Sequence, residues 1–505
     1  MKRLCKATYA VALTLAVAFT GIRGDGQTLE DQTLQNIERN SPGLVAEGVL
    51  SYIYGYPLLM FGVTGRTATT VPDAMTRLGA APLNQFGKEM VLPDASFTAV
   101  VLPSTSTLYA SSFLNLCEEP VILHLPNFGS RFFIMQMLDG WTEVSTQSPG
   151  SRQQSPEGDY ALVGPPCKDY KWPDIPGNVV ATIKMPTSSM WIIGRIYTDG
   201  SQSDIDYVTG TLYKGLTLTP LSKYKAGQTF TPPDALSVQP LADTITPPLR
   251  QVDGMDACAF FGNLAAMMMF NPPVAGQDDA IVRSLKRVGV AAGQPFDCTT
   301  LRDQKLENLQ KAVVLAKQIL ATVPATRPTS TGWTVSLDVG TYGRRYLLRA
   351  EVAQQALGAN RAVDAVYGYT QTDGNGTMLH GRRDYVIHFA KPGVNEGIPP
   401  VNKGGFWSLT IYDAEGKLVP SPDPVSANWN AVGMPFVQNH QACPNNDGSL
   451  DLYLQSTEPP KGTKQFCNWL PTPAKGGYIA FLRMYWPDQV ILSGDWIPPA
   501  IVRAN

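Results

Sequence analysis

Both ends of this chain consist of short apolar runs separated by turn residues, and this pattern limits the fold more than any other feature. The runs have the length of strands, whereas a helix needs about ten residues or more. In the middle of the chain the apolar residues recur at helical spacing instead. The sequence therefore predicts a mainly β protein with helical insertions: two β-sandwich domains joined by a helical segment.

The predicted strands are rich in branched and aromatic residues, and glycine, proline or asparagine residues bound them. They cover residues 120–126, 131–138, 191–197, 384–389, 406–412, 450–455 and 478–485. Helices are expected at 42–60, 256–270, 279–288, 302–322 and 346–357. We therefore place an N-terminal domain at 42–225, a helical connecting region at 250–358 and a C-terminal domain at 364–503.

The two β-rich regions resemble each other. An apolar strand with a histidine, His124 or His388, precedes an aromatic strand that ends in Asp139 or Asp413. This echo indicates either a duplicated β unit or a chance similarity between two amphipathic hairpins.

The N-terminus has the three parts of a secretory signal peptide. Lys2 and Arg3 form a basic start, and the apolar run Tyr9–Phe19 ends in small residues. The run is too short to span a bilayer. We expect residues 1–24 to be a signal peptide and the mature protein to be secreted or periplasmic, without stable membrane insertion; a retained N-terminal anchor is the alternative.

Composition narrows the partners and cofactors. The formal net charge is -2, which leaves no basic excess to attract nucleic acid. Four histidines and the lack of a C-x-x-C motif argue against a His-rich or zinc site, and the lack of a Walker loop or a G-x-G-x-x-G motif argues against a nucleotide cofactor. We therefore expect neither a metal nor an organic cofactor, with a metal bound by one or two histidines and carboxylates as the alternative. Six cysteines follow the signal peptide, and sequential pairing (117–167, 258–298, 443–467) is the favoured disulfide pattern, with buried free thiols as the alternative.

An ordered series of motifs resembles two adjacent domain-of-unknown-function families, 1254 in the N-terminal half and 1214 in the C-terminal half. The motifs include Tyr52-Ile-Tyr54-Gly-Tyr56-Pro57, Leu108-Tyr109-Ala-Ser111, Arg131-Phe-Phe-Ile-Met-Gln136, Tyr385-Val-Ile-His388-Phe389, Gly405-Phe406-Trp407-Ser408 and Gly494-Asp495-Trp496. The resemblance implies two jelly-roll-like domains joined by helices, and a homo-oligomer. One loop departs from the family: serines stand at Ser104 and Ser106, where the family usually has asparagine and aspartate.

His388 is the leading candidate for a catalytic residue, because a neutral imidazole can act as a general base near neutral pH. Asp413 or Asp139 would orient it, since each ends a strand and leads into a loop. The structural alternatives are a histidine paired with a neighbouring strand and aspartates that cap turns.

Arg195 and Arg483 occupy strand interiors among large apolar residues. A buried guanidinium needs a negative partner, so each forms an internal ion pair or receives an anionic substrate. Tyr109 and Trp407 lie in neighbouring segments, and we expect them either to line the ligand site or to belong to the core.

Two classes of function fit these features. The first is an exported, cofactor-independent hydrolase that acts on a small organic substrate through a His/carboxylate pair. The alternative is a non-catalytic oligomeric assembly or ligand-binding protein. Fold alone does not separate them.

Overall fold

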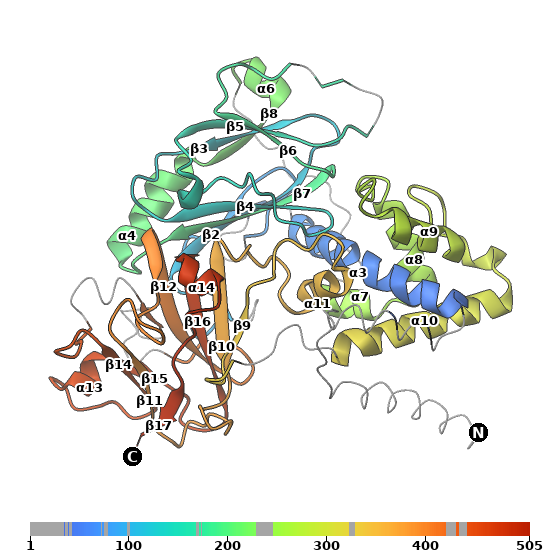
Figure 1. The fold of residues 1–505 in the computed structure, drawn as a ribbon. Helices are drawn as coiled ribbons and strands as arrows, with labels where there is room; N and C mark the ends of the chain where they lie inside the picture. Colours follow the sequence, from blue (N-terminus) through green and yellow to red (C-terminus); the bar gives the residue numbers. More distant parts are fainter. Residues whose placement is uncertain are drawn as a thin grey trace, which may run out of the picture.

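The computed structural model describes residues 43–71, 73–74, 79–97, 102–167, 171–172, 174–228, 246–322, 329–420, 431–433 and 442–504, together with Gln35 and Arg39. In these residues four mostly antiparallel sheets and a group of helices are arranged as two β units and one helical unit (Figure 1). The fold is β-rich with helices, as expected. The expected signal peptide, residues 1–24, lies outside the described residues.

The N-terminal β unit contains two sheets. The N-inner sheet has the order β1 (Gly87–Lys88), β2 (Thr107–Asn115), β7 (Ser189–Tyr197) and β4 (Phe133–Asp139). The N-outer sheet has the order β6 (Ala181–Lys184), β5 (Gly158–Val163), β3 (Val121–Leu125) and β8 (Thr217–Pro220). Both sheets contribute to one buried core, which includes Met135 and Ile192 from the first and Leu123 from the second.

The C-terminal β unit also contains two sheets. The C-inner sheet has the order β13 (Ala431–Gly433), β12 (Val401–Asp413), β16 (Tyr478–Pro487), β10 (Ala365–Thr370) and β9 (Thr334–Ser336). The C-outer sheet has the order β15 (Trp469–Pro471), β14 (Leu450–Gln455), β11 (Tyr385–Phe389) and β17 (Ile501–Arg503). Trp407 and Leu482 of the inner sheet pack with Ile387 of the outer sheet in a second core.

The two β units repeat one strand order. Strands β2, β7 and β4 correspond to β10, β16 and β12, and strands β6, β5, β3 and β8 correspond to β15, β14, β11 and β17. The parallel pair also recurs in the same place, as β5–β6 in one unit and β14–β15 in the other. The echo seen in the sequence thus corresponds to a repeated topology.

The helical unit is built around α3 (Gly43–Thr69). This helix packs in one core with α7 (Pro248–Asp253), α8 (Ala257–Met267), α9 (Asp279–Val288), α10 (Asp303–Thr322) and α11 (Tyr346–Gln355) (Figure 1). The N-terminal domain expected at 42–225 therefore includes a helix that packs in the core of the helical unit. By length and composition α3 could cross a membrane, but 83% of its most apolar window is buried inside the protein.

Local signals fix the helix ends. The Asp256 carboxylate accepts a hydrogen bond of 2.8 Å from the Ala259 N–H and caps α8. Gly289 ends α9 with a φ of 97°, a conformation that glycine adopts without steric cost. Shorter helices flank the sheets: α4 (Gln202–Tyr207), α5 (Tyr213–Gly215), α6 (Leu221–Lys225), α13 (Lys464–Cys467) and α14 (Gln489–Leu492).

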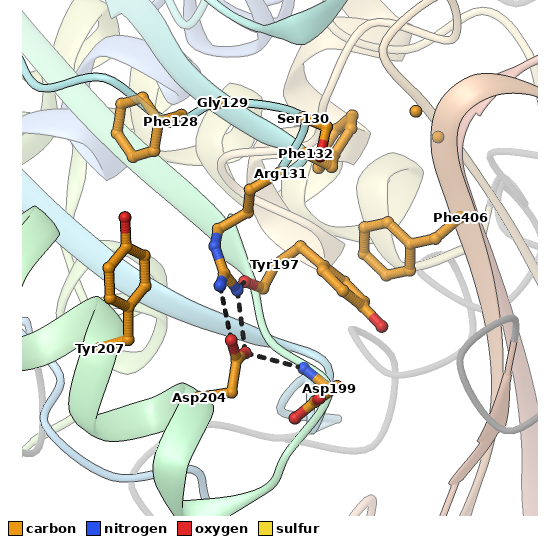
Figure 2. Close-up of a pocket in the computed structure, with 12 residues that line it drawn as sticks. Phe128, Gly129, Ser130, Arg131, Phe132, Tyr197, Asp199, Asp204, Tyr207 and Phe406 are labelled. Carbon is orange, nitrogen blue, oxygen red and sulfur yellow. Dashed lines mark hydrogen bonds and ion pairs between the residues drawn. The ribbon is translucent and has the colours of Figure 1, made fainter. Parts of the chain in front are cut away.

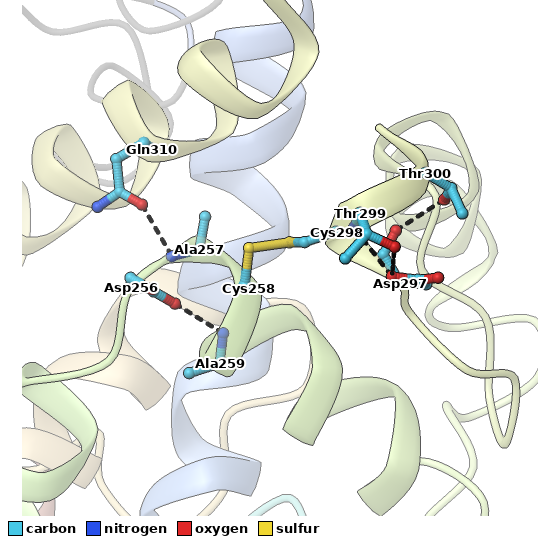
Figure 3. Close-up of a disulfide and its surroundings, with 9 residues drawn as sticks. All are labelled: Asp256, Ala257, Cys258, Ala259, Asp297, Cys298, Thr299, Thr300 and Gln310. Carbon is cyan, nitrogen blue, oxygen red and sulfur yellow. Dashed lines mark hydrogen bonds between the residues drawn. A yellow bond between two sulfur atoms is a disulfide. The ribbon is translucent and has the colours of Figure 1, made fainter. Parts of the chain in front are cut away.

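The sequential disulfide pairing is confirmed. Cys117–Cys167 lies in the N-terminal β unit, Cys258–Cys298 in the helical unit and Cys443–Cys467 in the C-terminal β unit. Figure 3 shows the second, which ties the first turn of α8 to the short turn after Asp297. Each of the three units therefore has one covalent cross-link of its own.

Candidate functional site

The two inner sheets meet face to face between the β units. Alternation along each central strand sends one set of side chains into the unit's own core and the other set toward the opposite unit. Ring centroids of Phe132 and Phe406 lie 5.3 Å apart across this interface, and those of Tyr197 and Phe406 lie 4.5 Å apart. Arg195 on β7 and Arg483 on β16 point into the same interface.

Arg195 is 7% exposed, and its described partners are neutral. One terminal nitrogen, Nη1, donates to Gln136 Oε1 at 2.5 Å and to Asn360 Oδ1 at 3.0 Å. The other, Nη2, donates to the Gly358 carbonyl at 3.2 Å, while Nε has no hydrogen-bond partner among the described residues. The guanidinium carbon lies 5.4 Å from the centroid of the Tyr109 ring.

Arg483 is 4% exposed and is held in a similar way. Nη2 donates to the Leu102 carbonyl and to the Tyr412 hydroxyl, both at 2.8 Å, and Nη1 donates to Thr410 Oγ1 at 3.3 Å. Neither Arg483 nor Arg195 takes part in the ion pairs formed by the described residues. The described residues therefore provide no internal ion pair for either arginine, which leaves the alternative of an anionic ligand.

Three tyrosines complete this constellation. Tyr109, Tyr367 and Tyr485 each interact electrostatically with both arginines, which places the two cations in one site. Burial raises the pKa of Tyr485 well above its ordinary value, so its hydroxyl is neutral and able to donate a hydrogen bond. We call Arg195, Arg483 and these three tyrosines the Arg–Tyr site.

Several buried hydroxyl groups at this interface have unused hydrogen-bonding capacity. The buried hydroxyls of Tyr485 and Ser408 have no hydrogen-bond partner among the described residues. The hydroxyls of Thr105 and Thr107 also have no hydrogen-bond partner among the described residues. Thr105 lies in the loop that departs from the family pattern, and Thr107 is the first residue of β2. These hydroxyl groups are able to form hydrogen bonds with a ligand bound at the interface.

A cleft of about 510 Å³ adjoins the Arg–Tyr site (Figure 2). Aromatic side chains line much of it, and Arg131 in its wall is neutralised by Asp204 through contacts of 2.5 and 2.9 Å. Phe406 lines the cleft on one side and stacks on Tyr485 with centroids 4.5 Å apart. One aromatic side chain therefore separates the cleft from the Arg–Tyr site.

His388 lies outside this interface, on the C-outer sheet. Its side chain is 59% exposed, and Nδ1 lies 2.6 Å from Asp451 Oδ1 on the paired strand β14. The expected pairing with Asp413 or Asp139 is therefore wrong, because the cross-strand neighbour supplies the carboxylate. His124 makes the equivalent contact of 2.7 Å with Asp159 in the other unit.

Asp139 and Asp413 shape equivalent turns. Oδ1 of Asp139 accepts the N–H groups of Trp141 and Glu143, and Oδ1 of Asp413 makes the same pair of contacts in its own turn. Burial, reinforced by the nearby Glu143 charge, raises the pKa of Asp139 to about 7. The capping alternative therefore accounts for the geometry of both residues.

Trp407 is 1% exposed and belongs to the C-terminal core, on the face of β12 opposite to Ser408. This position agrees with the core alternative for Trp407. Of the predicted substrate-binding residues, Arg195, Arg483 and Tyr109 come together. Sequence reasoning missed Tyr367; the repeat was the available signal, because Tyr367 lies opposite Arg483 as Tyr109 lies opposite Arg195. Among the described residues no group of three His, Cys, Asp or Glu side chains could hold a metal ion.

Two β units of one strand order, linked to a helical unit and sharing a buried cationic site, define the class of this protein. The chain carries the two domains that the sequence motifs indicated. Residues 83–220 match the family described as "Protein of unknown function (DUF1254)", and residues 364–489 match the corresponding family DUF1214.

Two solved structures are similar. The VPA0106 protein from Vibrio parahaemolyticus is 20% identical with a TM-score of 0.64, and the match covers 92% of this chain and all of that one. An uncharacterized protein from Burkholderia cenocepacia is 11% identical with a TM-score of 0.40 over 94% of this chain and 93% of its own. The first likeness shows that the fold is shared. No curated protein matches the chain.

Proposed function

We propose that the protein binds a small organic anion between its two β units, with the negative group at the Arg–Tyr site. The observation that carries this proposal is the pair of buried guanidinium groups, Arg195 and Arg483, whose described partners are all neutral. Burying a cation without a counter-charge costs several kcal/mol. A bound carboxylate, sulfate or phosphate would offset this cost.

The surroundings suit such a ligand. The free Arg195 Nε and the Tyr485 and Ser408 hydroxyls are donors that an anionic oxygen would accept. The adjoining cleft has the volume typical of small-molecule sites, and its aromatic lining fits an apolar ligand body.

We also infer the finer architecture and the compartment. One core shared by two sheets in each unit supports two jelly-roll-like β-sandwiches. Three disulfides favour an oxidising compartment and so support an exported protein.

Titration calorimetry of the mature protein with small carboxylates, sulfates and phosphates tests the binding proposal. We expect at least one anion to bind, and Arg195→Met to weaken it about 10- to 100-fold, the usual effect of removing a hydrogen bond to a charged group. Arg287→Met is the control, because Arg287 pairs with Glu47 in the helical unit, away from the cleft and the Arg–Tyr site. Binding that survives Arg195→Met, or no binding at millimolar concentration, would overturn the proposal.

A hydrolase that uses His388 is the second candidate. The contact of 2.6 Å between His388 and Asp451 favours it, because a carboxylate orients an imidazole that acts as a general base. A screen of ester substrates with the native protein and His388→Ala tests this function. Loss of at least 100-fold in turnover, with an unchanged melting temperature, would support it; equal turnover would remove it.

A further inference from the structure

Resting on the proposed function, we infer further that the ligand is an organic dianion, with one negative charge for each half of the repeat. The Arg–Tyr site lies between two copies of one β unit, and each copy contributes an arginine from its central strand. Because each copy supplies one cation, the correspondence between the copies indicates the charge of the ligand.

The arginines occupy equivalent places in the two copies. Arg195 lies directly opposite Tyr109 on β2, and Arg483 lies directly opposite Tyr367 on β10. These are the corresponding strands of the repeat. Each half thus presents the same arginine–tyrosine pair to the interface.

The equivalence extends to the neighbours on the same face. After the arginine, the next residue on that face is Tyr197 in one copy and Tyr485 in the other. The residues that hold the guanidiniums also correspond: Gln136 on β4 accepts from Arg195, and Thr410 on β12 accepts from Arg483. Their strand partners, Ile193 and Phe481, occupy the same register position.

Charge then sets the valence of the ligand. The site holds two guanidinium cations, and their described hydrogen-bond partners are carbonyl, amide and hydroxyl oxygens. A monoanion would neutralise one cation and leave the other buried without a counter-charge. A dianion neutralises both, so the geometry favours a dicarboxylate or a phosphate monoester over a monocarboxylate.

The two halves are not identical in detail. Arg483 already donates to Leu102, Tyr412 and Thr410, whereas Arg195 keeps Nε free. The two negative groups of the ligand therefore need not be the same. The aromatic cleft on one side of Phe406 provides room for a ring that carries them.

Titration calorimetry with matched probes tests the valence. Benzoate is compared with isophthalate and terephthalate, and phenyl sulfate is compared with phenyl phosphate at pH 8, where the phosphate carries two charges. We expect the dianion of each set to bind about 10- to 100-fold more tightly than the monoanion. Comparing the dicarboxylates with phenyl phosphate shows whether the site prefers two carboxylates or one doubly charged phosphate.

Variants of the two arginines separate the possible outcomes. Arg483→Met should reduce the preference for dianions to less than about threefold, whereas Arg195→Lys, which keeps the charge, should retain most of it. Arg287→Met, in the helical unit, should leave it unchanged. If the native protein binds monoanions and dianions with equal affinity, and Arg195→Met still loses this binding, the dianion inference is overturned while the proposed function stands. Failure of every probe to bind would overturn both.

Discussion

The buried carboxyl of Asp139 provides a sharp test of the electrostatics of this fold. The side chain lies at the end of β4, and its pKa is raised from 3.8 to about 7, mainly by burial and next by the Glu143 carboxylate. Asp139→Asn preserves the Oδ1 acceptor for the Trp141 and Glu143 N–H groups but cannot ionise.

The direction of the effect follows from proton linkage. Between pH 4 and 7 the folded state holds a proton on Asp139 that the unfolded chain has released, so this group destabilises the native protein as the pH rises. Each pKa unit corresponds to about 1.4 kcal/mol. From pH 4.5 to pH 8 the native protein should therefore lose on the order of 3 kcal/mol relative to Asp139→Asn.

Differential scanning calorimetry of both proteins across this range measures the effect. The melting temperature of the variant should gain roughly 3 °C over that of the native protein between pH 4.5 and 8, at about 1 °C per kcal/mol for a chain of 505 residues. Asp413→Asn is the matched control, because Asp413 makes the same turn contacts while keeping contact with solvent. A difference for Asp139→Asn that stays constant with pH would refute the reasoning.

Three further predictions concern the disulfide, the exposed histidine and the Arg–Tyr site. Cys258→Ser opens a cross-link with a sequence separation of 40 and should destabilise the helical unit by about 4 kcal/mol, measured as an earlier loss of the helical circular-dichroism signal in guanidinium chloride. His388→Ala should change the melting temperature by less than about 2 °C and leave anion affinity unchanged, because exposed ion pairs contribute at most about 1 kcal/mol; a tenfold loss of affinity would contradict this. Gly358→Ala should lower both stability and anion affinity, since φ is +87° and the new Cβ would lie 2.7 Å from Ile193 while the Gly358 carbonyl holds Arg195. Gly376→Ala, with a φ of +78° and open space around it, is its control; equal effects of the two would show that crowding near Arg195 plays no part.

Much of the fold was predictable because local signals were strong. The helix predicted at 279–288 coincides with α9, and the strand predicted at 450–455 coincides with β14. The disulfide pairing was also predictable, since each pair closes a loop within one unit. The packing of α3 with the helical unit was not predictable, because helical periodicity shows that a segment is a helix but not which core it joins.

The site was only partly predictable, for a reason that lies in the inner sheets. The segment Phe406–Tyr412 is buried throughout, because one face of β12 packs in the C-terminal core and the other packs against the N-terminal unit. A strand buried on both faces gives no alternation of apolar and polar residues, so the sequence could not say that Trp407 points away from Arg483. Cross-strand register was equally hidden, which is why Asp451 was missed as the partner of His388.

The distribution of the disulfides has a mechanical consequence. All six cysteines after residue 24 are used within single units, so none is left to tie the N-terminal β unit to the C-terminal one. The described contacts between the two β units include ring packing, the hydrogen bond from the Tyr412 hydroxyl to the Pro103 carbonyl, and an ion pair of 2.5 Å between Arg152 and Asp364. Oxidation therefore stiffens each unit internally and leaves the seam between the β units free of covalent restraint.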